Sequence, residues 1–266
     1  MSAALDLTFS GVDGRTVLTR RRYRWPLLIG RVFPDPQRPA VGSVTIQNAA
    51  GTVIPGDSVM QRLTVVDGGD AVVRGQGATT VSGTFSGAPA FEQTAVRVDS
   101  TSRLLLDAAP RILTPHAHYR QHTGVCVAPG GQAVLVDAVV LHPELTDDVF
   151  GSYRSDVEIT APDGSLLALD AQRLDSMPRV RRAPTSFATV YLVGAGLDTA
   201  LTALTPELEA LSVLTGDRCV YVGVSDLPND AGWAVRIAAA DGGALRTTLG
   251  AVTAAITENT VAVQRL

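Results

Sequence analysis

Three of the four histidines of this chain lie close together, at His116, His118 and His122 in the stretch TPHAHYRQH. If residues 116–122 are extended, the three side chains share one face, because successive side chains of a strand alternate. Two imidazoles two positions apart could hold a borderline metal such as Ni²⁺ or Zn²⁺. The same stretch contains no carboxylate or cysteine to complete a site. The pattern therefore indicates either a weak metal site or a polar, partly exposed strand or loop.

A single acid interrupts the longest apolar run of the chain, AVLVDAVVL at 133–141. An ionised carboxylate in a core is costly unless it is paired or hydrated. Val134, Val136 and Ala138 share the other face of this predicted strand, so Asp137 points to a sheet surface, to an arginine or into an internal polar cavity. A second acid, Asp57, follows Pro-Gly and is by default a turn residue.

Common signatures of catalysis and of nucleotide binding are missing. The chain has no G-x-S-x-G elbow, and it has no lysine to complete a phosphate-binding P-loop. The glycines around Gln76 do not open a helix, so they do not indicate a dinucleotide site. The two cysteines, Cys126 and Cys219, are too few for a disulfide framework, and we expect two free thiols in a reducing cytoplasm.

The composition narrows the class of protein further. The chain has 266 residues and a formal net charge of −4, which argues against a nucleic-acid partner. Hydrophobic residues make up 45% and charged residues 18%, enough apolar material for a large core. No apolar run approaches the ~18 residues of a membrane-spanning helix, and the N-terminus does not resemble a signal peptide. We expect a cytoplasmic protein with no membrane partner.

Short β-runs separated by Gly, Pro, Asp and Asn dominate the chain, and they predict a mainly β protein. Their spacing of roughly 8–12 residues is typical of sandwiches, barrels and β-solenoids. No fixed-period repeat is visible, which disfavours a regular solenoid written into the sequence. We predict one domain over residues 1–266, with many short strands in stacked sheets, as a β-helix-like or sandwich scaffold.

Two helices are predicted toward the C-terminus, near 201–214 and 243–258. In the first, Thr205 and Pro206 are suited to the N-cap and the first helical position. In the second, Leu245, Leu249 and two later apolar residues fall on one face. Such a helix usually docks on a sheet of its own chain. The alternative hypothesis is that Leu245 and Leu249 contact a partner protein.

Several short motifs follow one another along almost the whole chain. They are Pro26-Leu27-Leu28, GTVIPGD at 51–57, QGATTV at 76–81, LLLDAAPRI at 104–112, the acid-bearing run at 133–141 and GWAVRI at 232–237. In this order they resemble the UreD (UreH) family of urease accessory proteins. Each motif is weak alone, and the specificity lies in the ordered set.

The resemblance implies a non-catalytic scaffold that binds apo-urease and an all-helical UreF-like protein, which recruits a UreG-like GTPase. It also implies that nickel passes through the protein to urease, with no intrinsic cofactor. Such a passage needs hydrated or carboxylate-lined walls, because these cations lose water reluctantly. Five polar residues embedded in apolar β-segments are the candidate wall residues: Asp57, Gln76, Thr79, Thr80 and Asp137. Their other interpretation is as turn and solvent-face residues.

Two further functions remain open from the sequence. One is an all-β metal-dependent hydrolase that uses His116 and His118, with a third ligand and a general base supplied by the fold. The other is a binding module with an exposed groove and no metal function. A hydrolase would turn over substrate alone, whereas a nickel-delivery scaffold would be inert alone.

Overall fold

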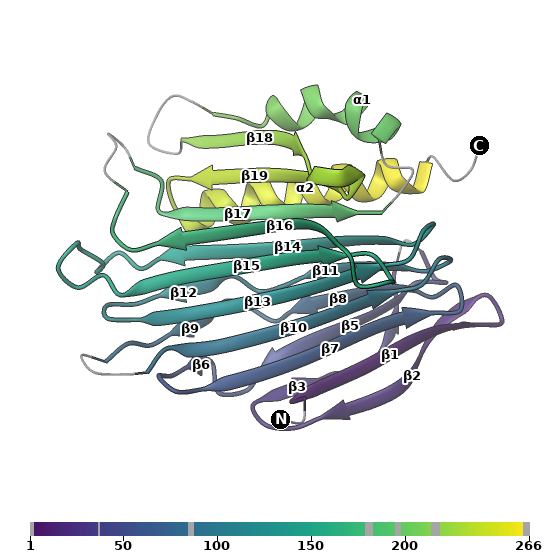
Figure 1. Cartoon of the computed structure of the whole chain (residues 1–266), viewed down its shortest axis with the longest axis horizontal. Helices are drawn as coiled ribbons and strands as arrows, with labels where there is room; N and C mark the ends of the chain where they lie inside the picture. The colour runs from purple at the N-terminus through teal and green to yellow at the C-terminus, as the bar shows by residue number, and fades with distance from the viewer. Residues whose placement is uncertain are drawn as a thin grey trace.

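The computed structural model describes residues 3–36, 38–84, 88–178, 183–194, 198–213 and 219–262. The fold is mainly β, as predicted, with two stacked sheets and two helices near the C-terminus (Figure 1). The first sheet has seven strands in the order β16-β15-β13-β10-β7-β1-β2. Their bounds are β1 Leu5–Val12, β2 Arg15–Tyr23, β7 Ser58–Val66, β10 Ala90–Val98, β13 His118–Val127, β15 Ser152–Thr160 and β16 Leu166–Leu174.

The second sheet has twelve strands, and its main path is β18-β19-β17-β14-β11-β8-β5-β3. Those strands are β3 Leu27–Ile29, β5 Gly42–Asn48, β8 Asp70–Gly75, β11 Arg103–Asp107, β14 Gln132–Leu141, β17 Ser186–Val193, β18 Val220–Asp226 and β19 Gly232–Ala239. Four short strands complete it: β4 Phe33–Pro34, β6 Thr52–Val53, β9 Thr79–Val81 and β12 Arg111–Leu113. A 3₁₀ turn spans Pro228–Asp230.

From β5 to β15 the chain winds alternately through the two sheets, and neighbouring strands within each sheet run parallel. This winding gives a β-solenoid-like core, although the sequence shows no repeat of fixed length. The register explains why: in the first sheet Phe91 lies opposite Ser58, Tyr119 opposite Ala90 and Ser152 opposite His118, so successive coils take 33, 29 and 34 residues. A repeat of varying length leaves no constant spacing to detect.

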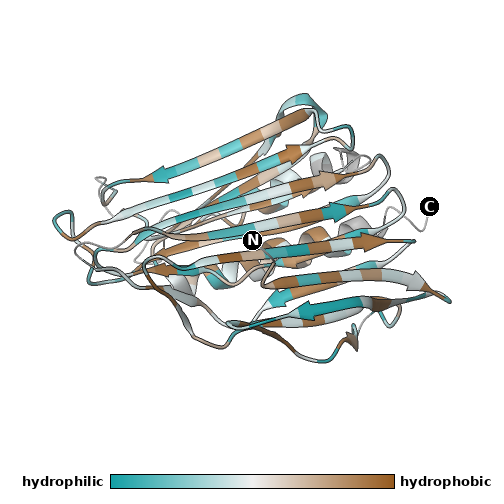
Figure 2. Cartoon of the chain, turned by 60° about the horizontal axis from the view of Figure 1, so that its bottom comes forward, coloured by the Kyte–Doolittle hydropathy of each residue, from teal (hydrophilic) through white to brown (hydrophobic). Residues whose placement is uncertain are grey.

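Hydrophobic and polar side chains alternate along the strands, so that one face of each sheet lies inside the solenoid (Figure 2). Two apolar clusters fill the interior. One surrounds Leu63, Val96 and Leu135, and the other surrounds Tyr119 and Tyr153. A third apolar cluster lies on the outer face of the second sheet, under the helices.

The two helices, α1 Asp198–Glu209 and α2 Gly242–Ala262, cover that outer face. Asp241 caps α2, since its Oδ1 accepts hydrogen bonds from the backbone N–H groups of Gly243 and Ala244 at 2.8 Å each. For α1 the predicted N-cap at Thr205 is wrong, because Thr205 and Pro206 lie inside a helix that begins at Asp198. Leu204 and Leu208 are buried against the sheet, and this packing holds the helix on both sides of the proline.

The predicted end of that first helix, at 214, lies outside the described residues. Among the residues that the structure describes, no helix is long and apolar enough to cross a membrane.

Candidate functional site

Polar side chains form a layer across the interior, between the two apolar clusters. In the first sheet Glu92 lies opposite Gln121, Gln121 opposite Ser155 and Ser155 opposite Gln172. On the neighbouring inner level, Thr94 lies opposite both Gln61 and Thr123. In the second sheet Asp137 lies opposite Thr189. We call this set the polar belt: Gln61, Glu92, Thr94, Gln121, Thr123, Asp137, Ser155, Gln172 and Thr189.

A cavity of about 90 Å³ lies within the belt, with room for several water molecules. It reaches from the surface into the core, since its wall includes the exposed Gln76 and also Glu92, which is only 5% exposed. The polar part of the wall consists of Asn48, Gln61, Gln76, Thr79, Glu92, Thr94, Arg111, Gln121, Thr123, Asp137 and Tyr191.

The cavity opens to the surface near Gln76, at what we call its outer end, and breaks in the strands of the second sheet lie there. The strands β5, β8 and β11 are each followed, after three residues outside any strand, by β6, β9 and β12. Gly75 marks one break, and a Cβ there would lie 2.5 Å from the backbone nitrogen of Ala109, so only glycine allows the two coils to approach so closely. The aligned breaks leave Gln76 and Ala109 at the cavity wall in place of a continuous strand.

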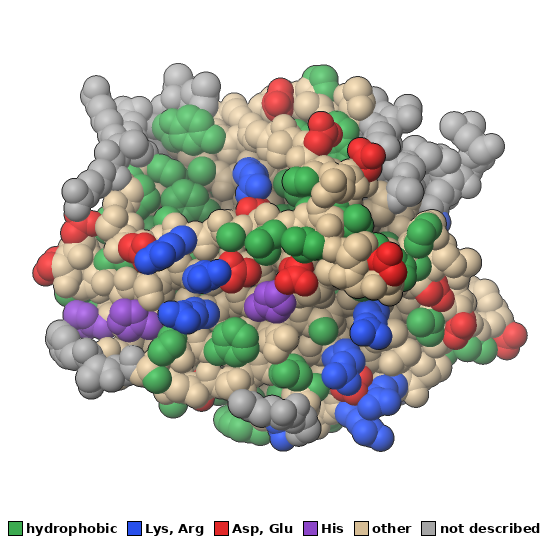
Figure 3. All heavy atoms as spheres, viewed as in Figure 1, with side chains coloured by type: hydrophobic (Ala, Val, Ile, Leu, Met, Phe, Trp, Pro, Cys, Tyr) green, Lys and Arg blue, Asp and Glu red, His purple; other side chains and the backbone are tan. Residues whose placement is uncertain are grey.

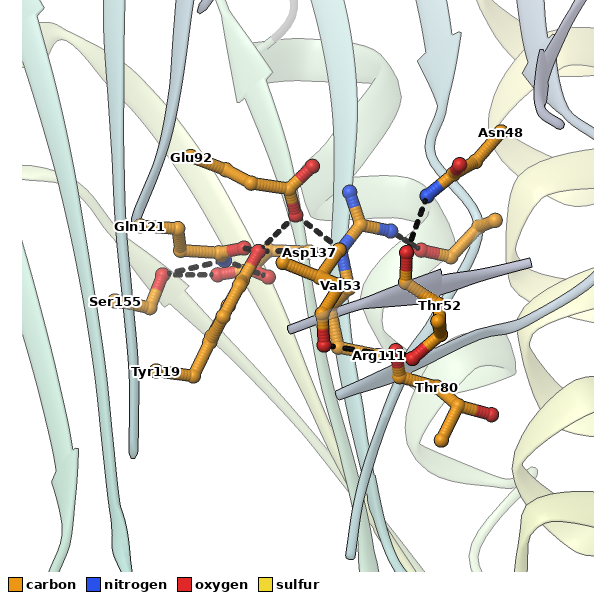
Figure 4. A network of polar contacts seen from close by, with 11 residues as sticks. Asn48, Thr52, Val53, Thr80, Glu92, Arg111, Tyr119, Gln121, Asp137 and Ser155 are labelled. Atoms are coloured by element: carbon orange, nitrogen blue, oxygen red, sulfur yellow. Dashed lines mark hydrogen bonds and ion pairs between the residues drawn. The ribbon is translucent and has the colours of Figure 1, made fainter. Parts of the chain in front are cut away.

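The cavity wall contains a buried ion pair between Arg111 and Glu92. The Nε of Arg111 donates to Glu92 Oε2 at 2.5 Å and to the Tyr119 hydroxyl at 3.1 Å, and its Nη1 donates to the carbonyl of Ala109 at 2.6 Å. The Tyr119 hydroxyl also donates to Glu92 (Figure 4). Burial lowers the pKa of Arg111, but the charges of Glu92 and Tyr119 and the hydrogen bonds to both together outweigh burial and raise that pKa. Arg111 therefore stays charged, and its guanidinium lies directly beside the Glu92 carboxyl group.

Asp137 enters the same space from the second sheet. Its Oδ1 accepts a hydrogen bond from Gln121 Nε2 and its Oδ2 accepts one from Ser155 Oγ, both at 2.5 Å. Burial raises the pKa of the Asp137 carboxyl above its ordinary value, and these two hydrogen bonds act in the opposite direction. Figure 4 shows Asp137, Gln121 and Glu92 converging from the two sheets.

The site offers hydroxyl, amide and carboxylate oxygens around a small wet space. Such oxygen donors suit a hydrated divalent cation, which exchanges its waters one or a few at a time. Asp137 is the carboxyl group of this wall whose two hydrogen-bond donors, Gln121 and Ser155, are uncharged. Nothing in this arrangement resembles a nucleophile with its general base.

Comparison with known proteins identifies the family of the chain. The family model described as "UreD urease accessory protein" matches residues 1–265. The chain belongs to the UreD family. A protein of Mycolicibacterium smegmatis named "Urease accessory protein UreD" is 56% identical over 246 residues, which cover 92% of this chain and 87% of that protein. A Bradyrhizobium protein named "Urease accessory protein UreD 2" is 32% identical over 257 residues, which cover 96% of this chain and 89% of that protein.

Three of the five candidate wall residues of this UreD chain do border the cavity: Gln76, Thr79 and Asp137. The other two do not. Asp57 lies in the turn between β6 and β7, where its Oδ2 accepts a hydrogen bond from the backbone N–H of Ile54 at 3.0 Å. Thr80 follows Thr79 on β9, and the alternation of the strand directs it to the opposite face.

Sequence reasoning missed Glu92, Arg111, Gln121 and Ser155. Glu92 carried a usable signal, because it occupies an inward position of the alternating stretch AFEQTAVRV at 90–98. Gln121 and Ser155 carried none, since polar residues at such positions usually face solvent. Only the winding of the solenoid brings them to Asp137.

The three histidines do not come together as a metal site. His116 lies in a turn with φ of 62°, so residues 116–122 are not extended throughout. His118 and His122 lie four residues apart on β13, which separates them by about 13 Å along the strand. His118 Nδ1 is instead paired with Ser152 Oγ at 2.9 Å, and its side chain is exposed on the outer face of the first sheet. Within the described ranges, no group of three or more His, Cys, Asp or Glu side chains could hold a metal ion.

The structure also argues against the predicted partner contact through Leu245 and Leu249 of α2. Leu245 is 1% exposed in the cluster between α2 and the second sheet, and Leu249 is half-buried against the same cluster. The apolar face of this helix is therefore occupied by the chain's own sheet. A partner that binds α2 would meet the opposite side of the helix, which exposes Arg246, Thr247, Gly250 and Ala251.

Proposed function

We propose that this UreD chain is a scaffold that binds apo-urease and passes Ni²⁺ to it through the polar cavity. The supporting observation is the polar belt, which places one or two polar side chains of each coil at two adjacent levels of an otherwise apolar interior. Burying so many polar groups is costly unless they are hydrogen-bonded or hydrated. A path for a hydrated ion would explain why the protein keeps these polar side chains in its interior.

The composition of the wall favours passage over storage. Hydroxyl and amide oxygens of Thr79, Thr94 and Gln121 are weak ligands for a borderline cation, whereas imidazole and thiolate hold Ni²⁺ tightly. An ion moves along a path when each site is attractive enough to enter and weak enough to leave. Asp137 supplies the attraction at the inner end of the cavity, and Gln76 lies at the outer end.

The partners follow from this role. We propose a UreF-like helical protein that binds the scaffold, a UreG-like GTPase recruited through it, and urease apoprotein as the acceptor. The scaffold itself performs no catalysis, and its function is carried out in the cytoplasm.

Co-expression tests the proposal. Urease subunits and the UreF- and UreG-like proteins should be expressed with and without this chain, followed by size-exclusion chromatography and nickel analysis. We expect the chain to co-elute with urease and its partners, and urease to contain nickel only when the chain is present. Urease that acquires the same nickel without the chain, or a purified chain that hydrolyses substrate alone, would contradict the proposal.

A further inference from the structure

Three arginines lie side by side on the outer face of the first sheet. The register places Arg120 on β13 opposite Arg154 on β15, and it places Arg154 opposite Arg173 on β16. All three side chains are exposed, and Figure 3 shows basic side chains grouped over these strands. Because neighbouring strands are about 4.8 Å apart, the set spans about 10 Å. We call Arg120, Arg154 and Arg173 the arginine row.

The arginine row keeps an excess of positive charge. Arg154 pairs with Asp156 at 2.8 Å, and Arg173 pairs with Asp175 at 2.6 Å. Arg120 forms no ion pair with any residue that the structure describes. Like charges directly opposite one another destabilise a sheet, so the row costs the fold some stability. A negatively charged partner would remove that cost.

The two ion pairs leave one end of each guanidinium group open. Arg154 donates through Nε to the carboxylate of Asp156, two residues along the chain. Arg173 donates in the same way to Asp175. The Nη nitrogens of both arginines form no hydrogen bond within the described part of the chain. A guanidinium group held at Nε is already oriented, and its Nη groups can still donate to a second carboxylate.

The spacing of the row suits acidic side chains on a helix. On one face of an α-helix, residues three and four apart lie about 5–6 Å from one another, so three of them span about 11 Å. On one face of an extended strand the spacing is about 7 Å, which matches arginines on adjacent strands less closely. A helix that lies across β13, β15 and β16 would place one carboxylate near each arginine.

Residues beside the row favour a protein over a nucleic acid as the partner. Phe91 lies opposite Arg120 on β10 and is 36% exposed, so it offers an apolar contact in line with the row. Aromatic and arginine side chains are enriched among the residues that dominate protein interfaces. Asp156 and Asp175 lie next to the row and would repel a chain of phosphates.

We propose that the arginine row binds an α-helix of a partner protein, one that carries three carboxylates on one face. Gln121 and Ser155 follow Arg120 and Arg154 along their strands and point into the polar belt. The row therefore lies on the opposite side of the first sheet from the cavity. The inference goes beyond the proposed function, because it holds whether or not nickel passes through the interior.

Disulfide tethering of synthetic helical peptides tests the arginine row on the full chain. Ser58 is exposed opposite Phe91, so Ser58→Cys places an anchor about 10 Å from Arg120, at the end of the row. The chain would also carry Cys126→Ala and Cys219→Ala, which leaves one thiol. The probe is an alanine-based peptide with an N-terminal cysteine and glutamates about seven, eleven and fourteen residues beyond it, which form one stripe. A second peptide has the same composition with its glutamates on different faces.

The two peptides are equilibrated with the chain in a thiol buffer, and mass spectrometry of the intact protein measures the fraction conjugated. We expect about fivefold more conjugate with the striped peptide, since its aligned carboxylates can form several exposed ion pairs and scattered ones fewer. Arg120→Gln should remove most of this preference, because Arg120 has no acid of its own. Arg246→Gln on α2 is the matched control and should keep the preference, since this exposed residue lies on the far side of the molecule.

Equal capture of the two peptides by the folded chain would overturn the proposal. A preference that survives Arg120→Gln, Arg154→Gln and Arg173→Gln together, in a chain whose circular dichroism is unchanged, would also overturn it. A thiol-linked oligothymidylate captured more strongly than the striped peptide would identify the row as a nucleic-acid site instead. None of these results depends on nickel transfer, so the proposed function is tested separately.

Discussion

Replacing Arg111 by methionine should lower the free energy of unfolding by about 3–5 kcal/mol, the range measured when one partner of a buried ion pair is removed. Arg111 donates to Glu92, whose side chain is 7% exposed, and without the guanidinium that carboxylate would be buried with no compensating charge. Denaturant unfolding followed by circular dichroism at neutral pH measures the change. The Tyr119 hydroxyl alone does not replace the lost charge.

Arg154→Met is the control for this prediction. Arg154 forms an ion pair of similar length with Asp156, at 2.8 Å, but its side chain is 54% exposed. Exposed pairs contribute about 0–1 kcal/mol, so this variant should stay close to the wild type. Adding Glu92→Leu to Arg111→Met should restore much of the stability, because the orphaned charge is then gone. If Arg111→Met and Arg154→Met lowered the free energy of unfolding equally, burial of the Arg111–Glu92 pair would not make it more important for stability than an exposed pair.

Asp137→Asn should abolish most nickel transfer to urease while leaving the protein at least as stable as the wild type at neutral pH. Asparagine keeps the shape of the side chain and still accepts a hydrogen bond, but it carries no charge to attract a cation. Nickel bound to urease after reconstitution measures the transfer. Glu158→Gln, which neutralises a carboxylate at an outward position of β15, should transfer nickel normally.

The pH dependence of stability gives this variant a second readout. The pKa of Asp137 is raised in the folded state, first by burial, so folding favours the protonated acid. Its contribution is therefore fully present below the ordinary carboxyl pKa and is lost as pH rises through the raised value. The stability of Asp137→Asn relative to wild type should thus increase as the pH rises across that window. A variant that is less stable than wild type at neutral pH would show that the ionised carboxylate stabilises the fold.

The sequence was sufficient for the mainly β class and for part of the site. Asp137 could be found because it breaks an apolar run, but its inward direction was one of three possibilities that the run left open, and the packing of Val136 and Ala138 under the helices decides it. Gln121 and Ser155 could not, because their meeting with Asp137 depends on coils of unequal length. Thr79 and Thr80 are successive residues of one strand, so their side chains point to opposite faces of the sheet. A shift of one residue in the predicted register would place Thr80 instead of Thr79 at the cavity.

The C-terminal helix illustrates a different limit. Its apolar face is visible in the sequence, but periodicity does not say whether a helix packs on its own chain or on a partner. Leu245 is only 1% exposed, which shows that the helix packs on the sheet of its own chain. The histidines fail for a related reason, since a turn at His116 breaks the extended segment that would have aligned them.

Reversible blocking of the cavity tests most directly whether nickel travels through this protein. A Thr123→Cys chain that also carries Cys126→Ala and Cys219→Ala has its one thiol at the cavity wall. The folded chain would be labelled with aminoethyl methanethiosulfonate, a small cationic thiol reagent, and then assembled with its partners and assayed for nickel transfer to urease. The same sample would then be reduced, desalted and assayed again. We expect transfer to fall to the level seen without the chain and to return once the disulfide is reduced. Undiminished transfer through fully labelled protein would contradict an internal route.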